Sequence, residues 1–575
     1  MTRNDIWQNL DQPWDIIVVG GGITGAGILR EGVRLGLKVL LVEQNDFAYG
    51  TSSKSSKLVH GGLRYLKEGK IGLTWASVQE RERLQQAAPG LVEPLGFLYA
   101  LFKGDNQWRE RWMMEAGLSL YDMLAVQWSH RHYNPREVWL LAPHLDNQQL
   151  AGAFQYSDAQ TDDVRLVLRV LREAVAAGGT AVNYASVRQL IREEEQVVGV
   201  VVRDEVSGRE MALHGRVVIN ATGAWVDGLR QMVGAEAKMR PLRGSHLVFA
   251  QWRFPVAQAI AFAHPLDGRP VMIYPWEGVT LVGTTDVDHH ESLSREPAIT
   301  ADEVAYLMAA VEAHFPRLGL GLEDVIATFA GVRPVIDTGQ SDPSKESRDH
   351  VVWQEHGLLT VTGGKLTTFR LIALDALAAV RQIWPEMPEP AEDAPAFDPV
   401  QVELPRQLLP EVRRRLLGRY GAEAAEVVAA AQSPAELEAI PHTPTLWAEV
   451  RWAARAEGVV HLEDLLLRRV RLGLLLPHGG AQWHDQLRGI VQGELGWDDG
   501  RWQAEWAAYL ARWRTYYSLP PREAIPNWRA WLAEKAAPPA VPEVAAEPSR
   551  TKAVAGVLLG AAVLSLASYW LLRRK

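Results

Sequence analysis

The sequence predicts an α/β protein with a Rossmann-like domain near the N-terminus, a mostly helical C-terminal domain and a final transmembrane helix. Three observations indicate this architecture: a strand–turn–helix–strand pattern at 14–46, a Pro- and acid-rich stretch before helix-patterned sequence, and a charge-free apolar run at 553–572. A chain of 575 residues, 47% of them hydrophobic, is long enough for more than one domain.

Composition excludes several classes of function. A formal net charge of −9, with no basic low-complexity block, disfavours nucleic-acid binding. The chain has no cysteine, so it forms no disulfide, thiolate-bound iron–sulfur cluster or CxxC redox pair, and redox chemistry requires an organic cofactor. The first residues lack an apolar core of secretory length, which favours a cytoplasmic main body.

The N-terminal pattern "WDIIVVGGGITGAGILREGVRLGLKVLLVEQND" is typical of a dinucleotide site. Gly20, Gly22 and Gly25 fit GxGxxG. In this motif the first glycine permits a tight turn, the second lets a pyrophosphate approach the backbone, and the third allows close helix–strand packing. Glu43 ends the second strand, where a carboxylate accepts a hydrogen bond from a ribose hydroxyl and repels a 2′-phosphate. This unit predicts FAD or NAD and argues against NADP.

The C-terminal run "AVAGVLLGAAVLSLASYWLL" predicts a single-pass anchor, because a helix of this length spans the ~30 Å hydrocarbon layer. Basic residues flank both ends, so charge alone does not decide its orientation. We place the main domain in the cytoplasm, on the inner membrane, for cofactor reasons. Gly556 and Gly560 form a GxxxG that either pairs two such helices in a homodimer or is an accidental match.

A hydroxyl-rich loop, "TSSKSSKLVHGGLRYL", follows the second strand directly. Seven further segments follow in order: "FQYSDAQTDDVRLVLRVLREAVAAGG", "VINATGAWVD", "RPLRGSHLVF", "MIYPWEGVTLVGTTDVDH", "AGVRPVIDTG", "SRDH" and "TVTGGKLTTFRL". Over residues 14–520 this set resembles the FAD-dependent, quinone-linked glycerol-3-phosphate dehydrogenase family. The resemblance implies FAD as the cofactor and glycerol 3-phosphate as the substrate.

The hydroxyl-rich loop is expected to hold the cofactor, because its hydroxyls and backbone donors suit pyrophosphate and flavin oxygens. The expected cofactor contacts in the loop are Thr51, Ser52, Ser53 and Ser55, and Thr222 and Gly223 of "NATG" join them. By resemblance His60 lies against the isoalloxazine ring, with a satisfied packing histidine as the alternative. Gly364 and Lys365 form a turn that aims a helix N-terminus at the flavin.

The substrate is a small dianion, and cations must hold it. Arg64 and Arg333 are the expected phosphate clamps, and by resemblance Tyr65 also faces the substrate. Lys365 serves either the flavin or the substrate. A surface ion pair is the alternative for Arg333.

His246, in a strand-like run that the family places above the flavin, is the candidate base. Loss of the C2 hydroxyl proton suits an imidazole, although a purely binding His246 explains the sequence nearly as well. Thr284 and Thr285, in "VGTTD", are expected on the same side of the flavin and complete the predicted substrate site.

The resemblance also implies an interleaved domain layout. The ranges are FAD binding at 14–90, 150–240 and 325–382; an α+β substrate domain at 91–149 and 241–324; a linker at 383–400; a helical domain at 401–535; a second linker at 536–552; and the transmembrane helix at 553–572. Within the helical domain Trp502, Trp506, Tyr509 and Trp513 have helical spacing and form either a core stripe, which we favour, or a membrane-interface belt.

The predicted activity is oxidation of glycerol 3-phosphate to dihydroxyacetone phosphate, with electrons passed to a membrane quinone. The nearest alternative is a glycerol-3-phosphate oxidase that reduces oxygen to hydrogen peroxide. A flavin-binding protein without turnover and an amino-acid oxidase of the same fold are weaker alternatives. No metal-ligand spacing, Walker loop or serine-type triad competes with these interpretations.

Overall fold

The N-terminal βαβ unit forms as predicted. The computed structural model describes residues 3–67, 69–104, 107–125, 129–339, 346 and 349–536. In it β1 (Trp14–Val19) pairs in parallel with β2 (Val39–Val42), and α2 (Ile23–Arg34) connects them. β10 (Glu210–Asn220) pairs in parallel with β1 on its other side.

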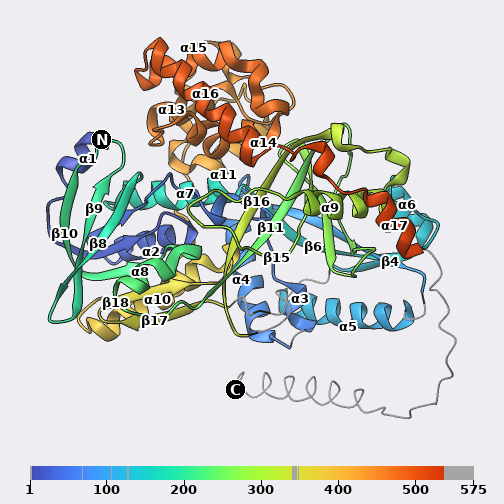
Figure 1. The fold of residues 1–575 in the computed structure, drawn as a ribbon, viewed down its shortest axis with the longest axis horizontal. Coiled ribbons are helices and arrows are strands. Elements are labelled where there is room, and N and C mark those ends of the chain that lie inside the picture. Colours follow the sequence, from blue (N-terminus) through green and yellow to red (C-terminus); the bar gives the residue numbers. More distant parts are fainter. Residues whose placement is uncertain are drawn as a thin grey trace. The chain divides into compact units, whose positions relative to one another are not determined.

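The βαβ unit lies in the first of two sheets, whose strand order is β17–β18–β10–β1–β2–β7, with β9 and then β8 extending antiparallel from β10 (Figure 1). The remaining strands of this sheet are β7 (Thr180–Val182), β8 (Ala185–Glu193), β9 (Gln196–Asp204), β17 (Val351–Glu355) and β18 (Leu358–Thr362). The parallel strands come from three distant parts of the chain.

Both faces of the first sheet are buried, which explains the unbroken apolar run in β1. Ile16 and Val18 enter a core under α2, α7 (Asp163–Ala176) and α10 (Phe369–Ile383). Ile17 and Val19 point to the opposite face and pack in a second core with the β8–β9 hairpin. Helices α1 (Arg3–Gln8) and α8 (Val226–Met232) contribute to that second core.

The second sheet has the order β15–β11–β14–β13–β12–β4–β6–β3, with β16 paired to β11 and β5 to β6. Its strands are β3 (Leu58–Val59), β4 (Val92–Phe102), β5 (Arg131–Tyr133), β6 (Leu150–Thr161), β11 (Met239–Ala250), β12 (Ala259–Ala263), β13 (Pro270–Trp276), β14 (Val279–Gly283), β15 (Val287–Asp288) and β16 (Val325–Ile336). Helix α9 (Ala301–His314), which begins with a capping box at Thr300, packs on one face.

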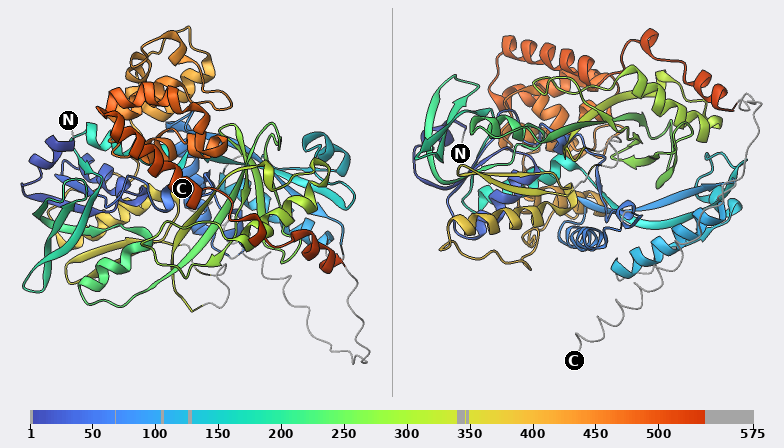
Figure 2. Two further views of the ribbon diagram at one scale, coloured as in Figure 1. Left: turned by 45° about the horizontal axis from the view of Figure 1, so that its top comes forward. Right: turned by 60° about the horizontal axis from the view of Figure 1, so that its bottom comes forward.

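Three helices lie together beside β4 and β6: α3 (Leu63–Lys67), α4 (Ile71–Ala87) and α5 (Gln107–Ala125) (Figure 1). The right-hand view of Figure 2 shows α5 next to these strands. Helix α6 (Pro135–Leu141) follows β5. The layer therefore lies beside the part of the second sheet that the hydroxyl-rich loop joins, because β3 lies within that loop and pairs with β6.

The helical C-terminal segment packs against the second sheet, and residues up to Leu532 form one unit. Its helices are α11 (Pro410–Tyr420), α12 (Ala424–Ala429), α13 (Trp447–Ala456), α14 (Leu472–Leu475), α15 (His484–Leu495), α16 (Asp499–Tyr516) and α17 (Trp528–Ala536). On α16, Trp502, Tyr509 and Trp513 are buried and Trp506 packs against them, which confirms the core interpretation of this stripe.

The predicted domain ranges stay a prediction, although three strands within the FAD-binding ranges join the second sheet. β6 and β16 belong to the second sheet, although the ranges 150–240 and 325–382 assign them to the dinucleotide-binding region. β3, within the range 14–90, also joins the second sheet. An alternating pattern shows which side of a strand is buried but not which sheet it joins.

Among the residues that the structure describes, no helix is both long and apolar enough to cross a bilayer. The predicted transmembrane segment 553–572, with Gly556 and Gly560, lies outside the described residues. It stays a prediction from the sequence.

Candidate functional site

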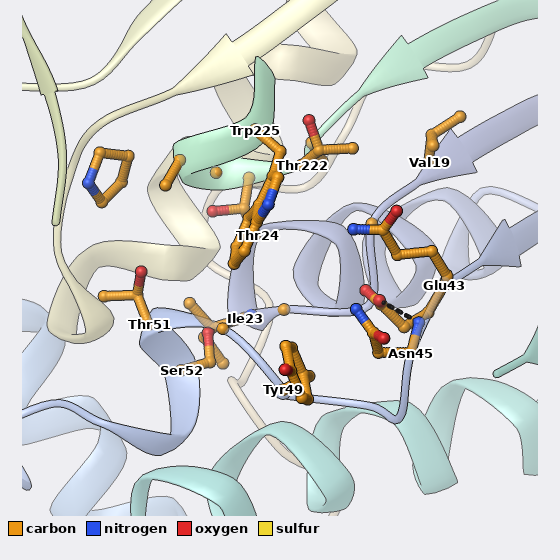
Figure 3. Close-up of a pocket in the computed structure, with 18 of the residues that line it drawn as sticks. Val19, Ile23, Thr24, Glu43, Asn45, Tyr49, Thr51, Ser52, Thr222 and Trp225 are labelled. Carbon is orange, nitrogen blue, oxygen red and sulfur yellow. Dashed lines mark hydrogen bonds between the residues drawn. The ribbon is translucent and has the colours of Figure 1, made fainter. Parts of the chain in front are cut away.

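A cavity of about 350 Å³ opens at the carboxyl ends of β1 and β10, where the chain leaves the first sheet. Parallel α/β sheets bind ligands at this edge, where strand connections diverge. The walls come from the glycine turn after β1, the segment from Glu43 through the hydroxyl-rich loop, β8, the turn after β10 with α8, and the turn before α10 (Figure 3).

The glycine turn has the geometry that GxGxxG predicts. Gly20 has φ +116°, and a Cβ there would lie 2.5 Å from the carbonyl oxygen of Ala221. A Cβ on Gly25 would lie 1.9 Å from the carbonyl oxygen of Gly20, so only glycine lets α2 pack this closely. Gly22 lines the cavity directly before α2, whose N-terminus faces the space.

Glu43 lies at the cavity, as predicted. Its Oε2 accepts a hydrogen bond from Gly21 N–H at 2.7 Å, and its Oε1 accepts one from Asn45 N–H at 2.8 Å (Figure 3). Burial raises the pKa of this carboxyl, and the two backbone donors oppose that shift. Each oxygen has a second lone pair, so the group can still accept a ribose hydroxyl.

The four predicted hydroxyls of the loop have different positions. Thr51, Ser52 and Ser55 line the cavity, and the hydroxyl of Ser52 accepts a hydrogen bond from Ile23 N–H at 3.0 Å. Ser53 is buried at the end of a 3₁₀ turn. Its hydroxyl donates hydrogen bonds to the carbonyls of Tyr49 and Gly50, both at 3.2 Å. The Ser53 side chain thus stabilises the turn, and its contact with the cofactor stays a prediction.

Asp163 of α7, which the sequence did not mark as a functional residue, anchors the hydroxyl-rich loop. Its Oδ2 accepts hydrogen bonds from Ser55 Oγ at 2.8 Å and from Lys57 Nζ at 2.7 Å, and both charged side chains are fully buried. Arg471 of the helical segment approaches its Oδ1 at 3.4 Å and donates to the carbonyl of Ser53 at 3.0 Å. The loop is thus held by α7 and by the C-terminal helices together.

A second buried anchor precedes the loop. Asp46 accepts hydrogen bonds from Arg469 at 2.6 and 2.7 Å and from Arg468 at 2.5 Å. These guanidinium groups hold the pKa of Asp46 well below its usual range, against the effect of burial. The helical segment therefore fixes both ends of the chain that forms this cavity wall.

Gly364 and Lys365 line the cavity at the turn before α10. Gly363 and Gly364 have φ values of +80° and +76°, which explains the glycine pair. Lys365 Nζ donates to Ser77 Oγ at 3.1 Å and lies 3.7 Å from the centre of the Tyr65 ring. Lys365 thus joins the cavity to α3 and α4.

His246 lies in β11, fully buried, with its ring stacked on Phe329 at 4.5 Å. Nε2 is 3.0 Å from Ser56 Oγ, and Nδ1 has no hydrogen-bond partner among the described residues. Burial, with the positive charges of Lys57 and Arg333, lowers the pKa of His246 well below its usual value. The imidazole is therefore neutral at neutral pH.

Arg333 lies in β16 between Val332, whose carbonyl accepts the hydroxyl of Thr51, and Pro334, which lines the cavity. Its guanidinium contacts Asp286 at 2.8 Å and the hydroxyl of Thr284 at 3.1 Å. Thr285 turns away, because its buried hydroxyl donates to Glu303 of α9 at 2.6 Å. The structure thus brings Thr284 to Arg333 and places Thr285 in a buried network.

Three predicted residues come from the segment around α3. Tyr65 is buried under Lys365, whereas the side chain of Arg64 lies outside the described part of the chain. His60 is half-buried, and its backbone N–H donates to Thr367 Oγ1 at 3.2 Å. It does not line the cavity, and its contact with the flavin stays a prediction.

Further cavity residues were not predicted. Trp225 follows the "NATG" turn, where Thr222 and Gly223 line the cavity as expected, and its indole N–H donates to the carbonyl of Leu293 at 3.0 Å. Asn45 and Tyr49 lie on the opposite wall (Figure 3). Trp225 could have been predicted from its position two residues after "NATG". Nothing in the sequence pattern marks Asn45 or Tyr49 as cavity residues.

These features define a dinucleotide-binding protein, because a glycine turn, the carboxylate of Glu43 and loop hydroxyls surround one cavity. FAD fits this donor set: the turn lacks the Cβ atoms that would block a pyrophosphate, and Lys365 borders the cavity at the turn before α10.

Comparison with known proteins identifies the family. Residues 15–370 match the family described as FAD dependent oxidoreductase, and residues 389–502 match the C-terminal domain of alpha-glycerophosphate oxidase. The "Glycerol-3-phosphate dehydrogenase 2" of Mycobacterium bovis is 35% identical over 528 residues, which cover 88% of this chain and 89% of the relative. The chain belongs to the FAD-dependent glycerol-3-phosphate dehydrogenase family.

Other similarities agree with this assignment. The "Aerobic glycerol-3-phosphate dehydrogenase" of Bacillus subtilis is 38% identical over 374 residues, covering 64% of this chain and 67% of the relative. The glycerol-3-phosphate dehydrogenase from Bacillus halodurans, solved in complex with FAD, superposes with a TM-score of 0.70 at 28% identity, covering 88% of this chain and 97% of that one.

Proposed function

We propose that the protein oxidises sn-glycerol 3-phosphate to dihydroxyacetone phosphate and passes the electrons to a membrane quinone. The observation that carries the substrate is the pair of cations beside the cofactor cavity, Lys365 on its wall and Arg333 next to the lining residue Pro334. Two fixed cations suit a phosphate dianion, whereas a carboxylate substrate needs one arginine. When bound, FAD accepts the hydride from C2 of the substrate.

The side chains around these cations have separate roles. Asp286 and Thr284 hold the guanidinium of Arg333 in one orientation, and its positive charge attracts the phosphate. Lys365 binds a substrate oxygen from the turn before α10, and Arg64 and Tyr65 complete the substrate site. His246, neutral and buried, accepts the proton of the C2 hydroxyl.

Replacement of His246 by Gln tests the base. We expect the rate of anaerobic flavin reduction by glycerol 3-phosphate to fall about 10²–10⁴-fold, the usual contribution of general base catalysis. In the native protein the rate should stay constant as pH falls through 6.5, the ordinary histidine value, and decline only at lower pH, because the imidazole stays neutral there. Stopped-flow measurement of flavin absorbance at several pH values gives both results.

The pH profile separates a base from a binding group. If His246 only binds the substrate, the Gln variant keeps the acid limb of the native profile and shows a higher KM. If it is the base, that limb disappears in the variant.

A quinone acceptor is supported by the predicted anchor at 553–572, since quinones dissolve in the bilayer and a tethered enzyme can reach them. A second candidate, the oxidase, is favoured by one observation: residues 389–502 match a domain described from alpha-glycerophosphate oxidase. The two differ in the acceptor alone.

Reoxidation of the reduced enzyme distinguishes these candidates. The full chain is reduced anaerobically with glycerol 3-phosphate and then mixed with either a soluble quinone analogue or oxygen. We expect rapid return of flavin absorbance with quinone and slow return with oxygen. Equally fast reoxidation by oxygen, with stoichiometric hydrogen peroxide, would assign the oxidase activity instead.

A further inference from the structure

A second cavity, of about 510 Å³, lies where α11 and the segment before it meet the turn that follows α4. We call it the arginine pocket. It is lined by apolar and charged side chains, which are Pro89, Val402, Glu403, Leu404, Arg406, Pro410, Arg413, Arg414 and Leu417. It shares none of these residues with the cofactor cavity. The proposed function does not use it.

Two of the three arginines in this pocket have no counter-charge. Arg414 donates hydrogen bonds to the two carboxylate oxygens of Glu93 at 3.0 and 2.9 Å, so its charge is compensated. The side chains of Arg406 and Arg413 form no ion pair or hydrogen bond with any residue that the structure describes, and neither does Glu403. The pocket therefore keeps an excess positive charge even when Glu403 is counted. Because the whole chain has a net charge of −9, this excess is a local feature that attracts anions.

Close backbone packing holds the walls of the arginine pocket in place. A Cβ on Gly90 would lie 2.0 Å from the carbonyl oxygen of Arg414, and a Cβ on Gly418 would lie 2.4 Å from that of Pro89. Glycine at both positions lets the turn after α4 contact α11 this closely. Arg169 of α7 donates to the carbonyl of Gly418 at 2.9 Å and fixes α11 from its other side. The pocket is thus formed before a ligand binds, which lowers the entropic cost of binding.

We propose that the arginine pocket binds a soluble phosphate monoester with an apolar body. Guanidinium groups bind phosphate oxygens through charge-assisted N–H bonds, and two of them match the charge of a dianion. Val402, Leu404 and Leu417 supply the apolar surface that the body of the ligand covers. The pocket is a second binding site, so this inference does not depend on the assigned substrate.

Isothermal titration calorimetry of the full-length, FAD-loaded protein tests the proposal with 1-naphthyl phosphate as the probe. We expect this compound to bind, inorganic phosphate to bind more weakly because it lacks the apolar body, and 1-naphthol to give no measurable binding because it lacks the charge. In Arg413→Ala the affinity for 1-naphthyl phosphate should fall about 10–100-fold, the effect of one charge-assisted interaction.

Two further variants serve as controls. Arg514 of α16 is exposed, has no ion pair within the described part of the chain and lies outside the pocket, so Arg514→Ala should bind the probe like the native protein. Arg333→Ala should also keep this binding, because Arg333 does not line the arginine pocket. Arg413 has no partner to lose, so chemical denaturation of Arg413→Ala should show native stability.

Equal affinity of the native protein and Arg413→Ala for 1-naphthyl phosphate would overturn the proposal. So would loss of binding in Arg333→Ala with retention in Arg413→Ala, which would assign the probe to the substrate site. Equal binding of 1-naphthol and 1-naphthyl phosphate would show an apolar cleft that does not recognise phosphate. None of these results uses turnover, so each leaves the assigned activity to its own test.

Discussion

Replacement of Arg333 by Ala should lower kcat/KM for glycerol 3-phosphate by about 10²–10⁴-fold. The estimate follows from two charge-assisted hydrogen bonds to phosphate at about 1.5–3 kcal/mol each, with 1.4 kcal/mol for each factor of ten. The loss of kcat/KM should appear mainly as a higher KM if the phosphate contact is equally strong in the ground state and the transition state. Steady-state kinetics with a soluble quinone analogue measures both parameters.

Arg240→Ala is the matched control for this prediction. Arg240 lies in the neighbouring strand β11, contacts Asp288 at 2.7 Å, and is 18% exposed, compared with 19% for Arg333. Arg240 pairs with Asp288 and Glu346 and has no substrate contact in the proposed function, so its loss should change kcat/KM less than threefold. Equal effects of the two substitutions would show that Arg333 acts through the stability of the sheet and not as a phosphate clamp.

Replacement of Asp163 by Ala should weaken FAD binding and destabilise the fold. The substitution leaves Lys57 and Arg471 buried without their shared carboxylate, and removal of one partner of a buried pair costs about 3–5 kcal/mol. Because Ser55 also loses its acceptor, the loop should lose its fixed position and bind FAD about 10–100-fold more weakly. Chemical denaturation and titration of the apoprotein with FAD measure the two effects.

The stability effect of Asp163→Ala should depend on pH. Burial lowers the pKa of Lys57 from 10.5 to about 8, and Asp163 opposes this shift, so without Asp163 the folded pKa falls further. The unfolded chain then binds more protons than the folded chain up to about pH 10.5, and stability increases with pH in that range. The native fold gains stability in the same way only above about pH 8, so the deficit of the variant should shrink as the pH rises to about 8 and stay constant between pH 8 and pH 10.

Glu449→Ala separates loop positioning from general destabilisation. Glu449 is buried in the helical segment, where it pairs with Arg415 at 2.5 Å and accepts the hydroxyl of Tyr420. We expect a comparable loss of unfolding free energy but native FAD affinity in the remaining folded protein. If this variant loses FAD as readily as Asp163→Ala, the loop has no special dependence on Asp163.

The local motifs could be predicted from the sequence because their constraints are local. Gly20 and Gly25 are required by backbone contacts within one βαβ unit, and Glu43 follows at the end of the same unit. The tryptophan stripe of α16 likewise follows from spacing within one helix. Family resemblance then placed Lys365 and Thr222 at the same cavity.

Long-range pairings could not be predicted in this way. Asp163 contacts Lys57 and Arg471, which lie more than one hundred residues before and after it in the sequence, and no sequence pattern predicts these contacts. The membership of β6 and β16 in the second sheet depends on strand pairing, which one sequence does not specify. Composition also does not show which hydroxyl of a 3₁₀ turn points inward, as that of Ser53 does.

Anaerobic reduction of the bound flavin tests the central claim most directly. The FAD-loaded full chain is mixed in a stopped-flow instrument with glycerol 3-phosphate or with glycerol, which has the same alcohol but no phosphate. We predict rapid loss of visible flavin absorbance with glycerol 3-phosphate and at least a 10²-fold slower loss with glycerol, because glycerol lacks the phosphate that the proposed cations Arg333 and Lys365 would bind. Equal rates with the two alcohols, or no reduction by glycerol 3-phosphate, would contradict the assigned substrate.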